Sequence, residues 1–191
     1  MILEYIKRGN KKSFNIDKLK GSIAEKIIES ILIEAGYEVY PFGYETFYRS
    51  LLDTLSKNIK DTEAQKLRSF PDLFVFDRKN NKSYILEVKF TNTTDEKEYW
   101  LQKHSFDKYV KFWSESILVV FSAKTKRVYC KRVNEIDIQN IPVKTSNRYG
   151  KNYSFDLTKD FHSISKYFLN IDEKKSNEYF KKIKEILRLF N

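Results

Sequence analysis

The stretch 69–90 constrains the fold more than any other part of the sequence, because two apolar runs there flank a short polar turn. Residues 74–76 and 84–90 are rich in the β-branched and aromatic side chains that favour strands. The turn between them, 79–82 (Lys-Asn-Asn-Lys), suits the tight connection of a hairpin. The sequence therefore predicts two antiparallel strands joined at this turn.

The second strand of this hairpin carries two opposite charges on one of its faces. Side chains alternate along a strand, so Glu87 and Lys89 share a face with Ile85. The opposite face is apolar and contains Leu86, Val88 and Phe90. Antiparallel pairing brings Asp72, at the start of the first strand, close to Glu87 and Lys89.

These three charged residues favour a particular chemistry. Buried charges are costly unless they are paired or bind a metal, and two neighbouring carboxylates repel each other unless a hard divalent cation joins them. A lysine beside the metal holds a water molecule or neutralises charge on a phosphate. Asp72, Glu87 and Lys89 are thus a candidate site for metal-assisted hydrolysis of phosphodiesters. The alternative is a cross-strand salt bridge on a half-exposed sheet.

The order Pro71-Asp72, hairpin, Glu87-Val88-Lys89 resembles the PD-(D/E)xK nuclease superfamily. This superfamily includes restriction endonucleases, archaeal Holliday junction resolvases and phage-type exonucleases. The resemblance covers residues 21–131. It implies an α/β fold with a restriction-endonuclease-like αβββαβ core, in which helices flank a mixed central sheet, here with a helical insertion and a C-terminal helix.

The resemblance also implies roles for the charged residues. Asp72 and Glu87 would bind Mg²⁺ or Mn²⁺ together with the backbone carbonyl of Val88. Lys89 would position or activate the attacking water. The implied activity is a metal-dependent DNA endonuclease that acts on branched DNA, such as recombination or replication intermediates, or on linear DNA. The archaeal resolvases further imply a homodimer.

A first helix is predicted from Gly21-Ser22 to Gly36, with an apolar stripe at helical spacing. Two roles are open to Glu25. With Ser22 as N-cap, Glu25 completes a capping box at the helix start. In the resembled family, a helix of the form Gly-x-x-x-Glu carries a glutamate that reaches the metal, often through water, and Glu25 matches it.

The remaining core elements follow in order. Residues 37–42 are predicted to form a short strand, and residues 45–68 a helical insertion that packs on the sheet, shapes a substrate channel or mediates a dimer contact. Residues 99–116 are predicted to form a second helix, and the apolar run 117–121 a strand buried on both faces. A strand, a helix and a strand at this spacing predict a parallel pair.

On the second helix, Gln102 is the candidate for the polar residue that family members place near the site. Tyr99 and His104 are substitutes for it. A metal-binding role for His104 is disfavoured, because it lacks partners at ligand spacing.

The last part of the chain contains basic candidates for DNA contact. Residues 127–133 are predicted to form an edge strand with a basic outward face, and a turn-rich loop follows around 144–153. The candidate DNA-binding residues are Lys124, Lys126, Arg127, Arg148 and Lys151. Solvated side chains with no specific partner are the alternative. A final helix at 177–190 caps the sheet or forms the homodimer surface.

Composition supports an anionic partner. The 191 residues carry a formal net charge of +10, which favours nucleic acid through phosphate contacts. No apolar run approaches the roughly 20 residues of a membrane span, and the single Cys130 suits a reducing cytoplasm. A nucleotide cofactor is not expected, because no Gly-rich phosphate loop is present.

The sequence predicts one nuclease-like domain over 1–191, with a core at 21–133, the insertion at 45–68 and a C-terminal helical extension at 155–190. The leading hypothesis is a divalent-metal-dependent deoxyribonuclease. The alternatives are a nucleic-acid-binding module that keeps the nuclease fold without its chemistry, and a purely structural or protein-binding domain.

Overall fold

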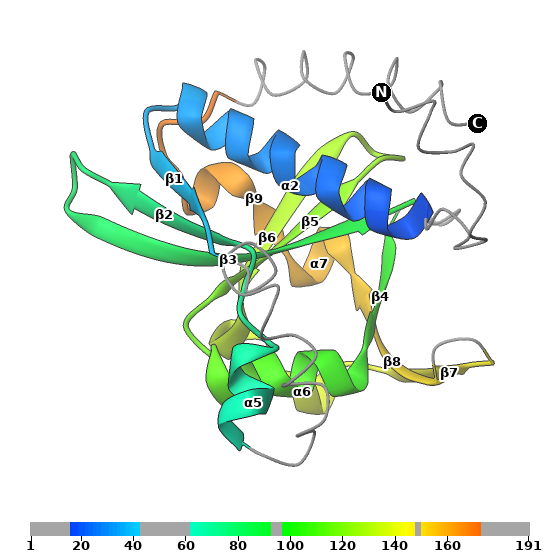
Figure 1. Cartoon of the computed structure of the whole chain (residues 1–191). Helices are drawn as coiled ribbons and strands as arrows, with labels where there is room; N and C mark the ends of the chain where they lie inside the picture. Colours follow the sequence, from blue (N-terminus) through cyan, green and yellow to red (C-terminus); the bar gives the residue numbers. More distant parts are fainter. Residues whose placement is uncertain (1–15, 43–61, 93–96, 148–149, 173–191) are drawn as a thin grey trace, which may run out of the picture.

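A six-stranded mixed sheet lies at the centre of the molecule (Figure 1). The computed structural model describes residues 16–42, 62–92, 97–147 and 150–172. The strand order is β1-β2-β3-β5-β6-β9. The strands are β1 (Glu38–Pro41), β2 (Leu73–Asp77), β3 (Lys82–Thr91), β5 (Ile117–Ser122), β6 (Arg127–Arg132) and β9 (His162–Ser163). All neighbours are antiparallel except β3 and β5, which form the predicted parallel pair.

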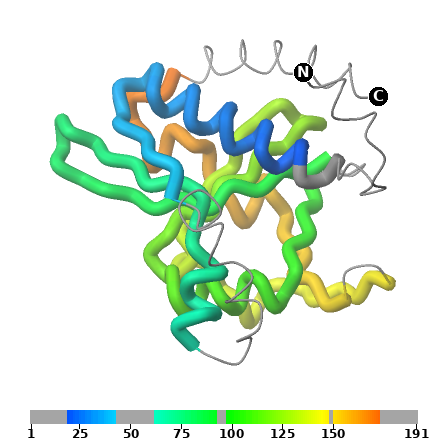
Figure 2. The backbone as a smooth tube through the Cα atoms, viewed as in Figure 1, coloured from blue at the N-terminus to red at the C-terminus, as the bar shows by residue number. Residues whose placement is uncertain are grey.

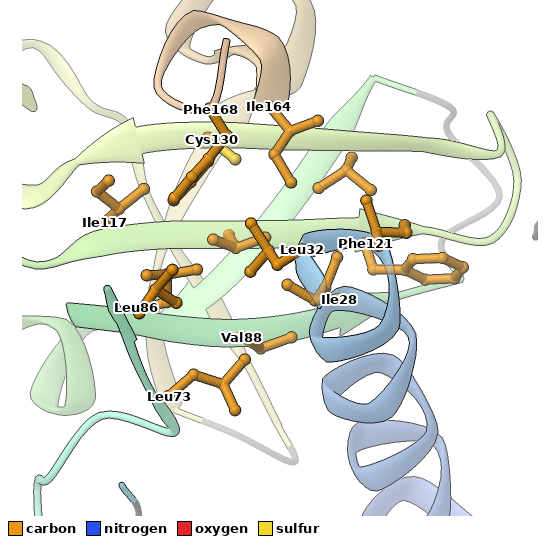
Figure 3. Packing of buried hydrophobic residues seen from close by; sticks show 14 of the residues in the cluster. Ile28, Leu32, Leu73, Leu86, Val88, Ile117, Phe121, Cys130, Ile164 and Phe168 are labelled. Carbon is orange, nitrogen blue, oxygen red and sulfur yellow. The ribbon is translucent and has the colours of Figure 1, made fainter. Parts of the chain in front are cut away.

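One face of this sheet is covered by α2 (Ile16–Glu34), as Figure 1 shows. Figure 3 shows Ile28 and Leu32 of α2 lying over the strands among Leu86, Val88 and Phe121. The helix ends as predicted, since Gly36 has a φ of 87° and the Tyr37 N–H donates to the Leu32 carbonyl at 3.0 Å.

The start of α2 corrects a sequence prediction. The helix begins at Ile16, so Gly21 and Ser22 lie inside it and Ser22 is no N-cap. A helix tolerates an interior glycine at a cost of about 1 kcal/mol, and nothing lies within 4 Å of the place where a Cβ at Gly21 would be. The glycine therefore does not mark a boundary, and the capping-box role of Glu25 is wrong.

The hairpin of β2 and β3 is confirmed. Asp77 pairs with Lys82, and the turn between them contains Asn81 with a φ of 51°, a conformation that asparagine tolerates. The Asp77 carboxylate accepts hydrogen bonds from the backbone and the side chain of Asn80, at 3.1 and 2.7 Å. This local bonding is typical of turn-forming Asx residues. The turn therefore sets the register of the two strands.

The connection from β3 to β5 differs from the prediction. The region 99–116 is not one helix: β4 (Glu98–Gln102) precedes a shorter helix, α6 (Lys103–Phe112). Tyr99 and Leu101 alternate with exposed or half-buried residues and pair with Phe155 and Tyr153. These long-range aromatic contacts stabilise a strand where local spacing suggests a helix.

A second, three-stranded sheet of order β4-β8-β7 follows from this difference. The strands β7 (Val143–Ser146) and β8 (Gly150–Asp156) contain Lys144 and Lys151, which the sequence places in a turn-rich loop. That loop assignment is wrong. Figure 2 shows the β7–β8 end projecting away from the central sheet.

A second apolar cluster fills the face of the central sheet opposite α2. It joins Phe106 of α6 and Phe155 of β8 to Leu118 and Val120 of β5. Because residues 117, 119 and 121 face α2 and residues 118 and 120 face this cluster, β5 is buried on both faces, as predicted.

The C-terminal part of the described chain contains short elements. These are η2 (Val133–Glu135), η3 (Ile138–Asn140), α7 (Leu157–Asp160) and η4 (Ile164–Lys166). The prediction that β6 is an edge strand is wrong, because β9 pairs with it. In the predicted insertion, α5 (Thr62–Leu67) is described, whereas residues 43–61 and the predicted final helix at 177–190 lie outside the described residues. None of the described helices is long and apolar enough to cross a lipid bilayer.

Candidate active site

Strand β3 divides its side chains between two environments. Leu86 and Val88 belong to the apolar cluster under α2, so Glu87 and Lys89 point to the opposite face. Glu87 is 3% exposed, and the Lys89 side chain is 28% exposed. The carboxylate is thus almost fully removed from water, whereas part of the lysine side chain remains exposed.

Asp72 joins this pair from the start of β2. Leu73 pairs with Leu86, so the next step of the register sets Asp72 opposite Glu87. The Val88 N–H donates to Oδ2 of Asp72 at 2.7 Å, and the Phe42 N–H donates to the Asp72 carbonyl at 2.8 Å. Asp72 therefore bonds to both of the strands that flank β2.

The electrostatics of Asp72 are those of a crowded acidic site. Burial and then the Glu87 charge raise the pKa of Asp72 well above its ordinary value, although Lys89 and the Val88 N–H act in the opposite direction. The Glu25 charge adds to the rise. The structure thus brings Asp72, Glu87 and Lys89 together and places Glu25 within electrostatic reach of Asp72.

Lys89 forms a short ion pair with Oε1 of Glu87. Burial lowers the pKa of Lys89, but the neighbouring Glu87 and Asp72 carboxylates outweigh this effect and raise it well above its ordinary value. In this state the amine is an ammonium group, which donates hydrogen bonds and cannot act as a base.

Tyr109 of α6 is a site residue that the sequence reasoning missed. Its hydroxyl donates to the same Oε1 of Glu87 at 2.5 Å, and the Lys89 Nζ lies 5.6 Å from the centre of its ring. Burial raises the pKa of Tyr109, so the hydroxyl stays protonated and keeps donating. The sequence feature that could have indicated this role is a tyrosine on the buried face of the helix that packs against a charged strand.

Gln102 and its two substitutes have different positions. Gln102 ends β4 on the side opposite Tyr99, and within the described part of the chain it makes no hydrogen bond to Asp72, Glu87 or Lys89. Tyr99 is buried, which raises the pKa of its hydroxyl, and Lys89 lies within electrostatic reach of it. His104 is exposed, with Ser105 as its hydrogen-bond partner at 3.4 Å.

The basic candidates fall into two groups. Lys124, Lys126 and Arg127 are exposed around the β5–β6 turn, at the end of the sheet toward which Lys89 lies, since Thr91 pairs with Ser122. Lys151 is exposed on β8 of the second sheet, and position 148, an arginine, lies outside the described residues. The described candidates therefore come from two different sheets.

A divalent metal such as Mg²⁺ needs oxygen ligands. In the described ranges, no group of three or more His, Cys, Asp and Glu side chains is arranged to hold a metal ion. Two oxygen-bearing carboxylates, Asp72 and Glu87, do lie together. Mg²⁺ is commonly bound through one or two carboxylates, with water and substrate phosphates as the remaining ligands. The residues present therefore fit Mg²⁺ bound together with a phosphate substrate.

No family model matches the sequence, and no curated protein matches it significantly. Among solved structures, the chain is similar to Hjc, a Holliday junction resolvase from the archaeal hyperthermophile Archaeoglobus fulgidus, with 13% identity and a TM-score of 0.44 over 74% of this chain and 93% of that chain. It is also similar to a nuclease from a fusselovirus, with 12% identity and a TM-score of 0.46 over 85% of this chain and 95% of that chain. At these values, neither likeness says what this chain acts on.

Proposed function

We propose that the chain is a divalent-metal-dependent nuclease that hydrolyses phosphodiester bonds in DNA. The observation that carries this proposal is the convergence of Asp72, Glu87 and Lys89 on one face of the β2–β3 hairpin. Two mutually repelling carboxylates beside an ammonium group are costly to bury, and a cation with a phosphate ligand would offset that cost.

Asp72 and Glu87 would hold Mg²⁺ or Mn²⁺, together with the Val88 carbonyl that the family resemblance implies. A bound metal of this kind supplies an acidified water molecule and stabilises negative charge on phosphate oxygens. Because Lys89 and Tyr109 both donate to Oε1 of Glu87, we assign Oε2 to the metal. Glu25 would act at longer range, through water.

Lys89 acts as a donor in this proposal. Its ammonium group would orient the attacking water or bind an oxygen of the phosphate, where charge accumulates during the reaction. The exposed part of its side chain gives it access to the substrate. Tyr109 positions Glu87 and does not touch the substrate.

Net charge and the family resemblance bear on the form of DNA that the chain would cleave. The net charge of +10 supports binding to the phosphate backbone, and the exposed Lys124 and Lys126 lie at the same end of the sheet as Lys89. Branched DNA is the substrate that the resemblance to archaeal resolvases favours. A homodimer would then bring two sites to symmetric strands.

Cleavage of a DNA panel tests the proposal. The full chain is incubated with linear duplex, single-stranded DNA and a four-way junction, in Mg²⁺, in Mn²⁺ and in EDTA. The variants are Asp72→Asn, Lys89→Met and the matched control Lys82→Met, which removes an exposed lysine at the other end of β3. We expect metal-dependent cleavage by the parent and the control, and none by the other two.

Parent-like cleavage by Asp72→Asn or Lys89→Met would refute the mechanism. DNA binding without cleavage by the parent in either metal would support the alternative, a nucleic-acid-binding module with a nuclease fold. Salt-insensitive or absent DNA binding would instead indicate a structural or protein-binding domain.

A further inference from the structure

An aromatic side chain lies directly beside Asp72 on the neighbouring strand. Pro41 of β1 pairs with Leu73, so the next step of the register sets Phe42 opposite Asp72. In agreement with this register, the Phe42 N–H donates to the Asp72 carbonyl at 2.8 Å. Leu73 belongs to the cluster under α2, so Asp72 and Phe42 both point to the opposite face, the one that carries Glu87. Side chains directly opposite each other in this way have Cβ atoms about 4.5–5.5 Å apart.

Phe42 is part of an array of aromatic rings on this face. Its ring centre lies 5.1 Å from that of Phe70, 6.2 Å from that of Phe74 and 6.2 Å from that of Trp113. The rings of Phe70 and Trp113 are 5.0 Å apart, and those of Tyr40 and Phe74 are 6.4 Å apart. We call Tyr40, Phe42, Phe70, Phe74 and Trp113 the aromatic platform.

The platform and the proposed active site are bounded by the same helix. Figure 1 shows α6 on the side of the central sheet away from α2. Trp113 follows Tyr109 by one helical turn, and its N–H donates to the Tyr109 carbonyl at 2.8 Å. Nε1 of Trp113 donates to the Ser69 hydroxyl at 3.2 Å, which fixes the indole ring, while the Tyr109 hydroxyl donates to Glu87. The platform is therefore continuous with the site and held in place beside it.

The platform rings keep part of their surface in water. Tyr40 is 51% exposed, and the other four platform residues are half-buried. By contrast, Phe106 and Phe155 in the apolar cluster of the same face are 0% and 1% exposed. A group of apolar side chains that stays partly exposed is typical of a binding surface. Flat rings suit a flat, apolar partner.

An unpaired base of the DNA substrate matches this surface. A phosphate bound at Asp72 brings the base of its own or the next nucleotide toward Phe42, because one strand rises only about 3.4 Å per nucleotide. Every base has a π-face that can stack on an aromatic side chain. In a continuous duplex both faces of each base are already stacked on its neighbours, so only an unpaired or displaced base is free to make this contact.

We propose that an unpaired base beside the bond that is cut stacks on the aromatic platform at Phe42. This inference rests on the proposed nuclease function and names its substrate class, DNA with unpaired nucleotides at the cut, such as forks and flaps. The platform would hold the base, while the metal site and Lys89 act on the phosphate. Stacking of this kind tolerates any sequence.

Removal of single bases tests the contact. A labelled DNA fork carries one abasic residue at successive positions around the boundary between its paired and unpaired arms, so every phosphate stays and one base at a time is lost. Fluorescence anisotropy in EDTA measures binding by the full chain without cleavage. The variants are Phe42→Leu, which keeps an apolar side chain without the ring, and Phe42→Tyr, which keeps the ring. The control is Tyr84→Leu, a half-buried ring that packs against Phe168 on the α2 face.

We expect the parent to bind about tenfold more weakly when one particular base is missing, which is the effect of one lost stacking contact. Phe42→Leu should bind the intact fork about tenfold more weakly and should no longer respond to the abasic residue at that position. Its slope of log affinity against log salt should equal that of the parent, because no phosphate contact is lost. Phe42→Tyr and Tyr84→Leu should keep the parent pattern. A parent that is insensitive at every position, or a Phe42→Leu protein with the parent's sensitivity, would overturn the inference.

Cleavage of the same forks separates this inference from the proposed function. The sensitive base should lie within about two nucleotides of the mapped cut, and a cut farther away would overturn the contact. Metal-dependent cleavage with no sensitive position removes only this inference. A sensitive position that depends on Phe42, without cleavage in Mg²⁺ or Mn²⁺, removes only the nuclease function.

Two further measurements exclude other effects of the substitution. Thermal unfolding checks that Phe42→Leu is folded, and the parent scan and Phe42→Tyr provide a test that does not depend on that variant. Sedimentation velocity compares the oligomeric state of parent and Phe42→Leu. A variant that changes its oligomeric state and keeps the parent's sensitivity to the missing base would show that a second copy of the chain covers the platform, and the base contact would then be wrong.

Discussion

Tyr109→Phe tests the role of α6 in the proposed active site. The substitution keeps the buried ring and removes only the hydroxyl that donates to Oε1 of Glu87 at 2.5 Å. Glu87 is 3% exposed, so water does not easily replace the lost donor. A hydrogen bond to a charged group contributes roughly 1.5–3 kcal/mol, and no cavity is created. We therefore expect a loss of about 2 kcal/mol in the free energy of unfolding.

Tyr109→Phe should change both the melting temperature and the metal requirement for cleavage. For a chain of this size, about 2 kcal/mol corresponds to a fall in Tm of about 4–8 °C. Groups that orient a metal ligand typically contribute about 10- to 100-fold to metal affinity or activity. The Mg²⁺ concentration for half-maximal cleavage by Tyr109→Phe should therefore rise by about 10- to 100-fold, because Glu87 is no longer held from α6.

The matched control is Tyr153→Phe, in the same apolar cluster. Its hydroxyl donates to Asp107 at a longer distance of 3.3 Å and does not contact the site. This control should lose less than about 1 kcal/mol and keep the parent metal requirement. Urea unfolding and a metal titration of cleavage measure both quantities. A Tyr109→Phe protein with the stability and metal requirement of the control would refute the positioning role.

Three further predictions concern charge and backbone conformation. Without metal, Asp72→Asn should be more stable than the parent in urea unfolding at pH 8, because burial and Glu87 raise the pKa of Asp72 in the folded state. In the folded parent, Asp72 therefore keeps its proton to a higher pH than in the unfolded chain, and the parent loses stability as pH rises through that raised pKa. The difference in stability between parent and variant should accordingly vanish in acid. A variant that is less stable than the parent at pH 8 would contradict this. Gly36→Ala should cost about 1–2 kcal/mol, since φ at Gly36 is 87°, whereas Gly21→Ala inside α2 should stabilise by about 1 kcal/mol, and equal effects on urea unfolding would show the backbone account to be wrong. Hydrogen bonds from Lys144 and Ser154 lower the pKa of Glu98 to about 2, so Lys144→Met should move it toward its ordinary value in a carbon-detected NMR titration, and a pKa that stays at about 2 would exclude Lys144 as the cause.

Local patterns predicted the part of the fold that depends on neighbours in sequence. The β2–β3 hairpin, the alternation that separates Leu86 from Glu87, and the parallel pairing of β3 with β5 all follow from short-range spacing. These same features bring Asp72 to Glu87. The candidate site could therefore be proposed from the sequence.

The errors arise where contacts across the chain outweigh local preference. The strand β4 forms because Tyr99 pairs with Phe155, a residue far along the sequence, and this partner is not visible to a helical spacing rule. The start of α2 differs from the prediction because Gly21, which resembles a helix boundary in the sequence, lies inside the helix. Tyr109 is buried on α6, and only the structure shows that its hydroxyl donates a hydrogen bond to Glu87.

The split environment of β3 limits how the hairpin can change in length. Adjacent positions of this strand serve opposite sides, with Val88 packed beneath α2 and Glu87 turned toward the reactive side. A single residue inserted or deleted within the paired part of β3, between Lys82 and Glu87, would exchange the two sides and drive a carboxylate into the apolar interior. Tolerated length variants here should thus come in pairs of residues.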